Sequence, residues 1–218
     1  MSTPNQALAM LSAPDSPTAE AFRALRANIK FARGAGSPRV ILLADTDSGA
    51  ARPTVAANLA IALAQAGDPT ILIDADLRQP GLHRLLGVPG DAGLSTLLRE
   101  ASAEPTLVAT GVPGLRLLPA GPPPPNPAEL LASDDFRALL LWAREAATFV
   151  IIDAPPVTAV SDALAIAAIA DGTLLVVRAG HTRRPAAQRA KEELERVGAT
   201  LLGVVLTDTK PERGEYKY

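Results

Sequence analysis

A strand, a turn and a helix near residue 50 constrain the fold more than any other stretch of the sequence. The apolar run Arg39–Leu43 predicts a buried strand, and the Ala- and Leu-rich run Thr54–Ala66 predicts a helix that ends at Gly67. The turn between them reads ADTDSGAARP and contains a glycine. This order of elements is that of a phosphate-binding P-loop, in which backbone N–H groups fold around phosphate.

The turn lacks the side chains with which a P-loop binds phosphate and magnesium. The pattern G-x-x-x-x-G-K-[ST], aligned on the strand and the helix, has its defining positions at Thr46, Ala51, Arg52 and Pro53, and none of them matches. Arg52 keeps a positive charge, but a planar guanidinium does not replace a compact ammonium in a tight loop. Pro53 has neither the hydroxyl that would hold magnesium nor a backbone N–H. The sequence therefore predicts a P-loop frame with a degenerate Walker A motif.

The neighbouring residues do not repair this mismatch. Thr54 carries a hydroxyl one residue later, roughly 100° further around the helix, so it does not take the missing position. Asp45 and Asp47 place carboxylates where a polyanion would have to sit. If a nucleotide binds here, the candidate contacts are Gly49, Ala50, Ala51, Arg52, Pro53 and Thr54.

The composition fits one well-packed domain. The chain has 218 residues, 48% of them hydrophobic, and a formal net charge of -2. We expect a flexible lead-in at 1–15, a single domain at 16–208 and a flexible tail at 209–218. The absence of cysteine suits a reducing cytoplasm and excludes disulfides. Apolar runs are shorter than the roughly 18–20 residues that span a bilayer, and the charge is not basic, so we expect neither direct membrane insertion nor a nucleic-acid partner.

Two further apolar strands end in aspartate. The run Thr70–Asp74 is followed by Asp76, and a second run ends at Asp153. Open α/β sheets bind ligands at the carboxyl ends of their strands, and carboxylate oxygens suit magnesium. Asp74, Asp76 and Asp153 are therefore the candidate magnesium ligands. The alternative for Asp153 is a structural one, in which its carboxylate caps the next turn.

Strands and helices alternate along the whole chain. This alternation predicts an α/β fold with a doubly wound, mostly parallel sheet flanked by helices on both faces, like that of P-loop NTPases. In the helix expected at 134–147, we assign Phe136, Leu140 and Trp142 to the core rather than to a cofactor site.

Two groups of residues outside the expected sheet have a functional interpretation as well as a structural one. Glu20, Arg23 and Arg26 recur every three residues on the helix expected at 16–31, so they form either a solvated face or a charged contact with another subunit. Tyr216 and Tyr218 are the only tyrosines of the chain and both lie in its tail. A flexible end would bring them within reach of an active site, in the same copy or another.

From about residue 16 to residue 208 the chain resembles the bacterial tyrosine kinases of capsule and exopolysaccharide assembly, which are relatives of the ParA and MinD ATPases. The matching stretches are EAFRALRANIKF, AANLAIALAQAG, ILIDADLRQPGLHRLLG, GLSTLL, PNPAELL, FVIIDAPPVTAVSDA and GVVL. Such kinases carry a sequence like P-G-E-G-K-S where this chain has SGAARP, so only Gly49 of that loop is kept.

The resemblance implies a role for each of the matching residues. Asp74 and Asp76 would organise magnesium and activate the attacking tyrosine hydroxyl, and Asp153 would be the Walker B carboxylate. The helix with Glu20, Arg23 and Arg26 would join subunits into a ring, and Tyr216 and Tyr218 would be the phosphate acceptors. The implied cofactors are ATP and Mg²⁺. The implied partner is a transmembrane polysaccharide co-polymerase, which would hold the chain at the cytoplasmic face of the membrane.

The sequence leaves three functions open. In the first, the chain binds ATP poorly or not at all and serves as a regulatory or scaffold subunit, because phosphoryl transfer depends on positioning and charge stabilisation at the phosphates. In the second, it is an active protein-tyrosine autokinase whose unusual loop still binds Mg-ATP, with Arg52 on the phosphates as a catalytic residue. The third, a ParA- or MinD-like positioning ATPase, is disfavoured because no amphipathic C-terminal helix and no basic patch are present.

Overall fold

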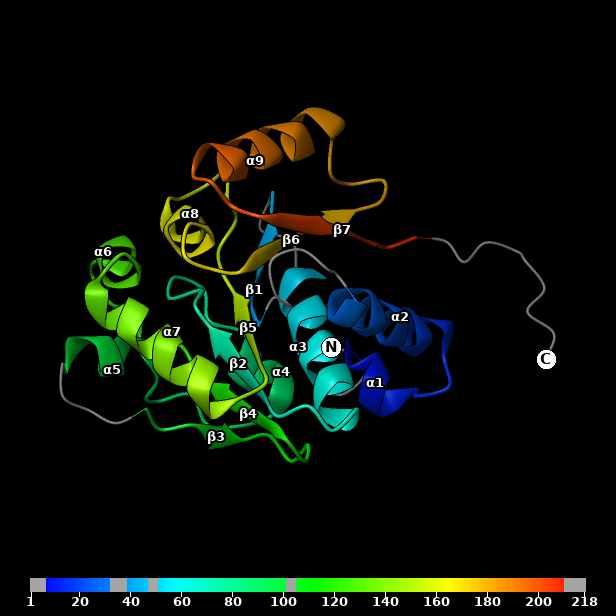
Figure 1. Ribbon diagram of the computed structural model, residues 1–218, viewed down its shortest axis with the longest axis horizontal. Coiled ribbons are helices and arrows are strands. Elements are labelled where there is room, and N and C mark those ends of the chain that lie inside the picture. Colours follow the sequence, from blue (N-terminus) through cyan, green and yellow to red (C-terminus); the bar gives the residue numbers. More distant parts are fainter. Residues whose placement is uncertain (1–6, 32–38, 47–50, 101–104, 210–218) are drawn as a thin grey trace.

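One seven-stranded sheet organises the computed structural model, which describes residues 7–31, 39–46, 51–100 and 105–209 (Figure 1). Its strand order is β3-β4-β2-β5-β1-β6-β7. All neighbouring strands are parallel except β3 and β4, which form an antiparallel hairpin at one edge. The strands are β1 (Val40–Asp45), β2 (Thr70–Asp74), β3 (Val108–Ala109), β4 (Leu115–Leu118), β5 (Phe149–Asp153), β6 (Gly172–Arg178) and β7 (Leu201–Thr207).

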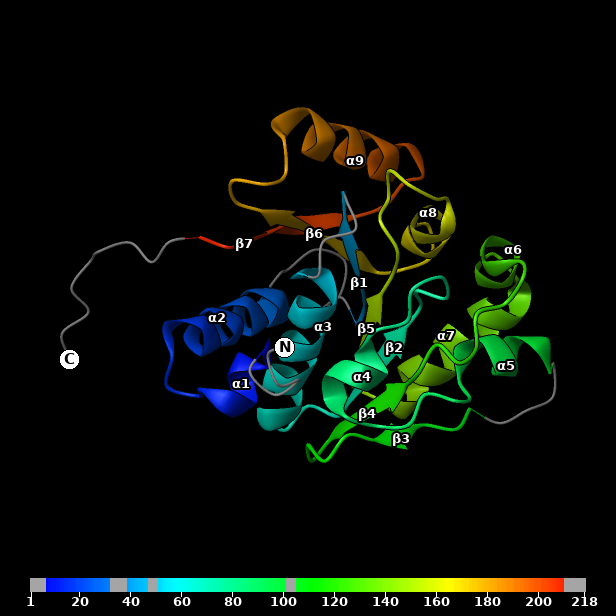
Figure 2. The same cartoon turned by 180° about the vertical axis from the view of Figure 1, so that it is seen from behind.

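Helices cover both faces of this sheet. Helix α7 lies in front of the sheet in Figure 1, and α4 does so in the reverse view of Figure 2. The helices of the α4 face are α1 (Ala9–Ser12), α2 (Pro17–Phe31), α3 (Ala51–Gln65) and α4 (Leu82–Leu86). Those of the α7 face are α5 (Leu94–Arg99), α6 (Pro127–Leu131), α7 (Asp134–Ala146), α8 (Asp162–Ala167) and α9 (Arg184–Arg196). This arrangement confirms the predicted α/β fold.

The central strands are buried on both faces. Every residue of β1, β2 and β5 is buried, as the uninterrupted apolar runs of the sequence predict for parallel strands that helices cover on both sides. Successive side chains of β1 pack into two separate hydrophobic cores. Ile41 and Leu43 lie on the α3 side of the sheet, and Val40 and Leu42 lie on the α7 side. The sheet therefore fixes the carboxyl ends of its central strands firmly.

Helix α3 follows the P-loop-like turn and is buried in the core along most of its length. Its residues from Val55 to Ala64 are all buried, because the helix lies between the sheet and helices α1 and α2. It begins at Ala51, three residues before the start expected from the sequence. Pro53 thus lies in its first turn, where a missing N–H breaks no helical hydrogen bond.

Part of the expected lead-in at 1–15 packs against α3. Leu8 and Met10 are buried in the core on that side. The Asn58 side chain accepts a hydrogen bond from the Met10 N–H at 3.0 Å and donates to the Ala7 carbonyl at 3.1 Å. The four residues of α1 are too few to give a periodic pattern, so the sequence alone did not predict this helix.

Candidate functional site

Strand order brings three carboxylates to one edge of the sheet. Asp45, Asp74 and Asp153 are the last residues of β1, β2 and β5, and β5 lies between the other two strands. The strand register places Asp74 directly beside Asp153. Asp76 follows two residues after β2. This edge is where open α/β sheets bind their ligands.

The guanidinium of Arg52 lies among these carboxylates. Arg52 Nε donates to Asp153 Oδ1 at 2.6 Å, Nη1 donates to Asp45 Oδ1 at 2.9 Å, and Nη2 donates to Asp76 Oδ2 at 2.8 Å. Each of the three nitrogens therefore has its own aspartate. The planar, forked shape of arginine allows this, whereas a lysine ammonium is a single point of charge.

The network is buried. Arg52 is 3% exposed, Asp45 5%, Asp76 6% and Asp153 1%. Three carboxylates against one guanidinium leave an excess of negative charge, and Asp74 lies next to them. A buried charge is tolerated when it is paired and hydrogen-bonded, so removal of Arg52 would leave acidic groups facing one another without compensation.

The pKa values reflect this competition between burial and pairing. Burial by itself lowers the pKa of Arg52, but the charges of Asp153, Asp45 and Asp76 raise it above its ordinary value. Burial raises the pKa of Asp153, and the guanidinium at 2.6 Å opposes that rise. Arg52 stays protonated, so its charge favours the ionised form of Asp153 against the effect of burial.

Asp74 lies beside Asp153 in the sheet, but its hydrogen bonds go to groups outside the Arg52 network. Its Oδ2 accepts hydrogen bonds from the N–H groups of Gly81 and Leu82 at the start of α4, both at 3.0 Å. Its Oδ1 is buried and has no hydrogen-bond partner among the described residues. Burial and the charge of Asp153 raise the pKa of Asp74 to about 7, against the opposing effect of these N–H groups.

The described residues do not fit a magnesium nucleotide in the manner of a P-loop. The oxygens that would ligate magnesium on Asp76 and Asp153 bond to Arg52 instead. The side chain at the lysine position points to the sheet edge, toward carboxylates. In the described part of the chain, no group of three or more His, Cys, Asp or Glu residues is arranged to hold a metal ion. Pro53 supplies neither a hydroxyl nor an N–H to phosphate.

Several expected site residues lie outside this network or outside the described chain. Ala51, Pro53 and Thr54 lie in the first turn of α3 beside Arg52, and all three are partly exposed. Gly49, Ala50, Asp47, Tyr216 and Tyr218 fall in ranges that the structure does not describe.

The three charged residues of α2 have different surroundings. The Glu20 side chain is 72% exposed and pairs with Arg23 at 3.0 Å. Arg23 also donates to the Pro14 carbonyl at 2.7 Å, and Arg26 donates to the Ala62 carbonyl of α3 at 3.1 Å. Glu20 is therefore the most available of the three for a contact with another subunit.

The structure adds an ion pair that the sequence did not predict. Arg78, just after Asp76, donates from Nε and Nη2 to the two carboxylate oxygens of Asp162 at 2.9 and 3.0 Å. Asp162 is fully buried at the start of α8. The pair ties the segment after β2 to the segment after β5. The sequence did not indicate this ion pair, because Ser161 and Asp162 are residue types that commonly occur at the start of a helix.

Comparison with known proteins gives the class and then the family. The fold is that of the P-loop NTPases: MinD from Pyrococcus horikoshii, solved with Mg-ADP, superposes with a TM-score of 0.65 at 23% identity, over 81% of this chain and 72% of that one. The search against protein-family models found no match.

Closer similarity is to bacterial tyrosine kinases. The chain is 38% identical over 210 residues to the tyrosine-protein kinase YwqD of Bacillus subtilis, covering 95% of this chain and 89% of that protein. It is 34% identical to the putative tyrosine-protein kinase CapB of Staphylococcus aureus, covering 88% and 85%. The kinase domain of Escherichia coli ETK superposes with a TM-score of 0.89 at 31% identity, over 97% and 84%. The chain therefore belongs to the family of bacterial tyrosine kinases of capsule and exopolysaccharide biosynthesis.

Proposed function

We propose that this chain is a tyrosine-kinase-like subunit of capsule or exopolysaccharide assembly that is impaired in ATP binding and acts as a scaffold or regulator. The observation that carries the proposal is the set of three buried ion pairs of Arg52. The guanidinium takes the place that magnesium would need, and the excess carboxylates repel a polyphosphate. The P-loop residues are also missing at Thr46, Ala51 and Pro53, which supports the same conclusion.

Such a subunit would act through its contacts. Glu20, Arg23 and Arg26 would join copies into a ring, and a transmembrane co-polymerase would hold that ring at the cytoplasmic face of the membrane. No helix within the described ranges combines the length and the apolar character needed to cross a bilayer.

Calorimetric titration of the purified, dephosphorylated protein with Mg-ADP and Mg-ATP tests the proposal. We expect no heat of binding from the native sequence. A variant carrying Ala51→Gly, Arg52→Lys and Pro53→Ser restores the loop, and it should bind both nucleotides. Micromolar binding by the native sequence would refute the proposal.

The second candidate is an active autokinase, favoured by the presence of Asp74, Asp76 and Asp153 at the strand ends. It requires Arg52 to leave its aspartates and bind the phosphates of ATP. It predicts phosphate on Tyr216 and Tyr218 after expression, which mass spectrometry would detect, and loss of that phosphate in Asp76→Ala. Unmodified tyrosines in the native protein would exclude it.

A further inference from the structure

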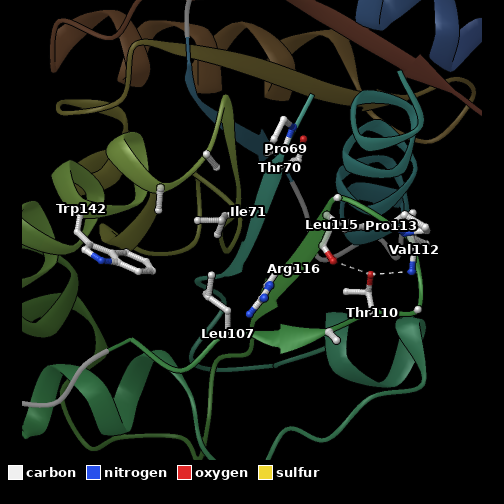
Figure 3. Close-up of a pocket in the computed structure, with 15 residues that line it drawn as sticks. Pro69, Thr70, Ile71, Leu107, Thr110, Val112, Pro113, Leu115, Arg116 and Trp142 are labelled. Atoms are coloured by element: carbon white, nitrogen blue, oxygen red, sulfur yellow. Dashed lines mark hydrogen bonds between the residues drawn. The ribbon is translucent and has the colours of Figure 1, made fainter. Parts of the chain in front are cut away.

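We propose that a cavity at the opposite end of the sheet binds a small aromatic anion, with Arg116 holding the acidic group and Trp142 contacting the ring. This site is independent of the proposed function, because it shares no residue with the Arg52 network. Figure 3 shows the cavity between α7 and the β3–β4 hairpin.

The cavity lies at the amino ends of the strands. It has a volume of about 700 Å³ and includes the first residues of β2 and β4, Thr70 and Leu115. Cavities of roughly 300–1,000 Å³ are typical of small-molecule sites. Helix α7 contacts β5 in the middle of the sheet, and its C-terminal part lines the cavity together with the β3–β4 hairpin.

The charge of the lining is positive. Among the described residues that line the cavity, Arg116 is the one charged side chain, and none is a carboxylate. Arg116 is exposed on β4, and its side chain has no hydrogen bond or ion pair with the described residues. By contrast, Arg144 near the end of α7 pairs with Asp171 at 2.9 Å. An unpaired guanidinium in a cavity without acids favours a carboxylate, sulfonate or phosphate, which it can bind through two parallel N–H groups.

The rest of the lining is suited to an apolar body. Trp142 is 37% exposed and points toward Leu107 from α7, and Ile71 forms the floor between them (Figure 3). The neighbouring Leu141 is 64% exposed. The indole of Trp142 offers a flat apolar surface, and aromatic rings stack well on indole. A ligand with an aromatic ring and one acidic group matches both parts of the cavity.

The wall opposite Trp142 is held in shape by hydrogen bonds. Thr110 Oγ1 donates to the Leu115 carbonyl at 3.0 Å and accepts from the Val112 N–H at 3.3 Å (Figure 3). The Thr70 N–H donates to the Gly114 carbonyl at 2.8 Å, which joins this turn to the start of β2. A wall that is ordered before binding loses little freedom when the ligand arrives.

A pair of fluorescent probes tests the site, and Trp142 reports on it because it is the only tryptophan of the chain. Anilinonaphthalene sulfonate is an aromatic anion, and N-phenylnaphthylamine has nearly the same ring system without the charge. Titrated into the full-length protein, the anion should quench Trp142 emission and saturate at one site per chain. In Arg116→Gln its affinity should fall about tenfold, the effect of losing one charged hydrogen-bonding partner, while affinity for the neutral probe stays the same.

Two further variants keep the test decisive. Arg137→Gln makes the same change on α7 outside the cavity lining and should leave both probes unaffected. Leu107→Asp puts a carboxylate in the cavity and should remove binding of the anion. The proposal fails if Trp142 emission does not respond to the anion, if Arg116→Gln binds it as tightly as the native protein, or if Arg137→Gln weakens it equally.

Discussion

Arg52 controls both the electrostatics and the stability of the carboxyl edge of the sheet. It is the one cation within bonding distance of Asp45, Asp76 and Asp153 among the described residues. A buried ion pair adds little net stability compared with apolar packing, but loss of one partner leaves the others buried and unpaired. The residue that prevents phosphate binding under the proposed function is therefore also one that the fold needs.

Arg52→Ala should lower the free energy of unfolding by about 3–5 kcal/mol, because three buried carboxylates lose their cation. The same change frees their oxygens for a divalent cation. We therefore expect added MgCl₂ to recover part of the stability of the variant and to leave the native protein unchanged. Urea denaturation with and without MgCl₂ measures both effects.

Arg137→Ala, on the exposed face of α7, is the control for this experiment. It should change stability by less than about 0.5 kcal/mol, as surface substitutions usually do. An Arg52→Ala protein as stable as this control would contradict the buried network.

Asp74 should make stability depend on pH near neutrality. Its pKa is about 7 in the folded protein and 3.8 in the unfolded chain, so between these values the folded state binds more protons. Stability therefore falls as pH rises from about 4 to 7, and levels off above that. Between pH 5 and pH 8 we expect the contribution of Asp74 to decrease by about 1–3 kcal/mol.

Asp74→Asn should remove this dependence, because the amide keeps an acceptor for the Gly81 and Leu82 N–H groups and carries no charge at any pH. Urea denaturation of both proteins at pH 5 and pH 8 provides the comparison. Parallel losses of stability in the native protein and the variant would show that another group titrates in this range.

At the level of elements, Asn58 joins the N-terminal segment to the helix that carries Arg52. Its side chain bonds to Ala7, Met10 and the Thr54 carbonyl. Asn58→Ala should destabilise the protein by about 1–3 kcal/mol, because it leaves the buried Met10 N–H unpaired. Hydrogen exchange followed by mass spectrometry should show faster exchange in residues 7–13. The exposed Asn126→Ala variant should exchange like the native protein, and equal rates in all three would contradict this contact.

Elements were easier to predict from the sequence than contacts. The apolar runs predicted β1, β2 and β5, and the helical periods predicted α2, α3 and α7, with boundaries within a few residues. The three partners of Arg52 were not predicted, because they depend on which strands lie side by side. Trp142 was assigned to the core wrongly. Buried Phe136, Leu139, Leu140 and Ala143 define the inner stripe of α7, and Trp142 lies off that stripe.

At the level of the whole molecule, the two candidate sites lie at opposite ends of one sheet, so contacts between subunits can be tested separately from both. Glu20 is exposed on α2, and Arg23 is the one partner of its side chain among the described residues. Under the proposed ring assembly, Glu20→Ala should reduce the sedimentation coefficient toward that of a monomer. Its melting temperature should stay within about 2 °C of the native value, because an exposed ion pair contributes little to stability.

Arg26→Ala is the informative comparison, because Arg26 also bonds to Ala62 within the chain. That variant should lose stability as well as assembly. A native protein that sediments as a monomer at all concentrations, or a Glu20→Ala protein that assembles normally, would count against a ring.

The three-way pairing of Arg52 also restricts the mutational paths open to the gene. The single substitution Arg52→Lys leaves three buried aspartates with one ammonium in place of a forked guanidinium. The resulting protein is less stable, and it does not yet have a complete loop for ATP. Ala51 and Pro53 would still need to change. Selection for stability alone thus retains the guanidinium, and under the proposed function this makes a return to a working phosphate site difficult.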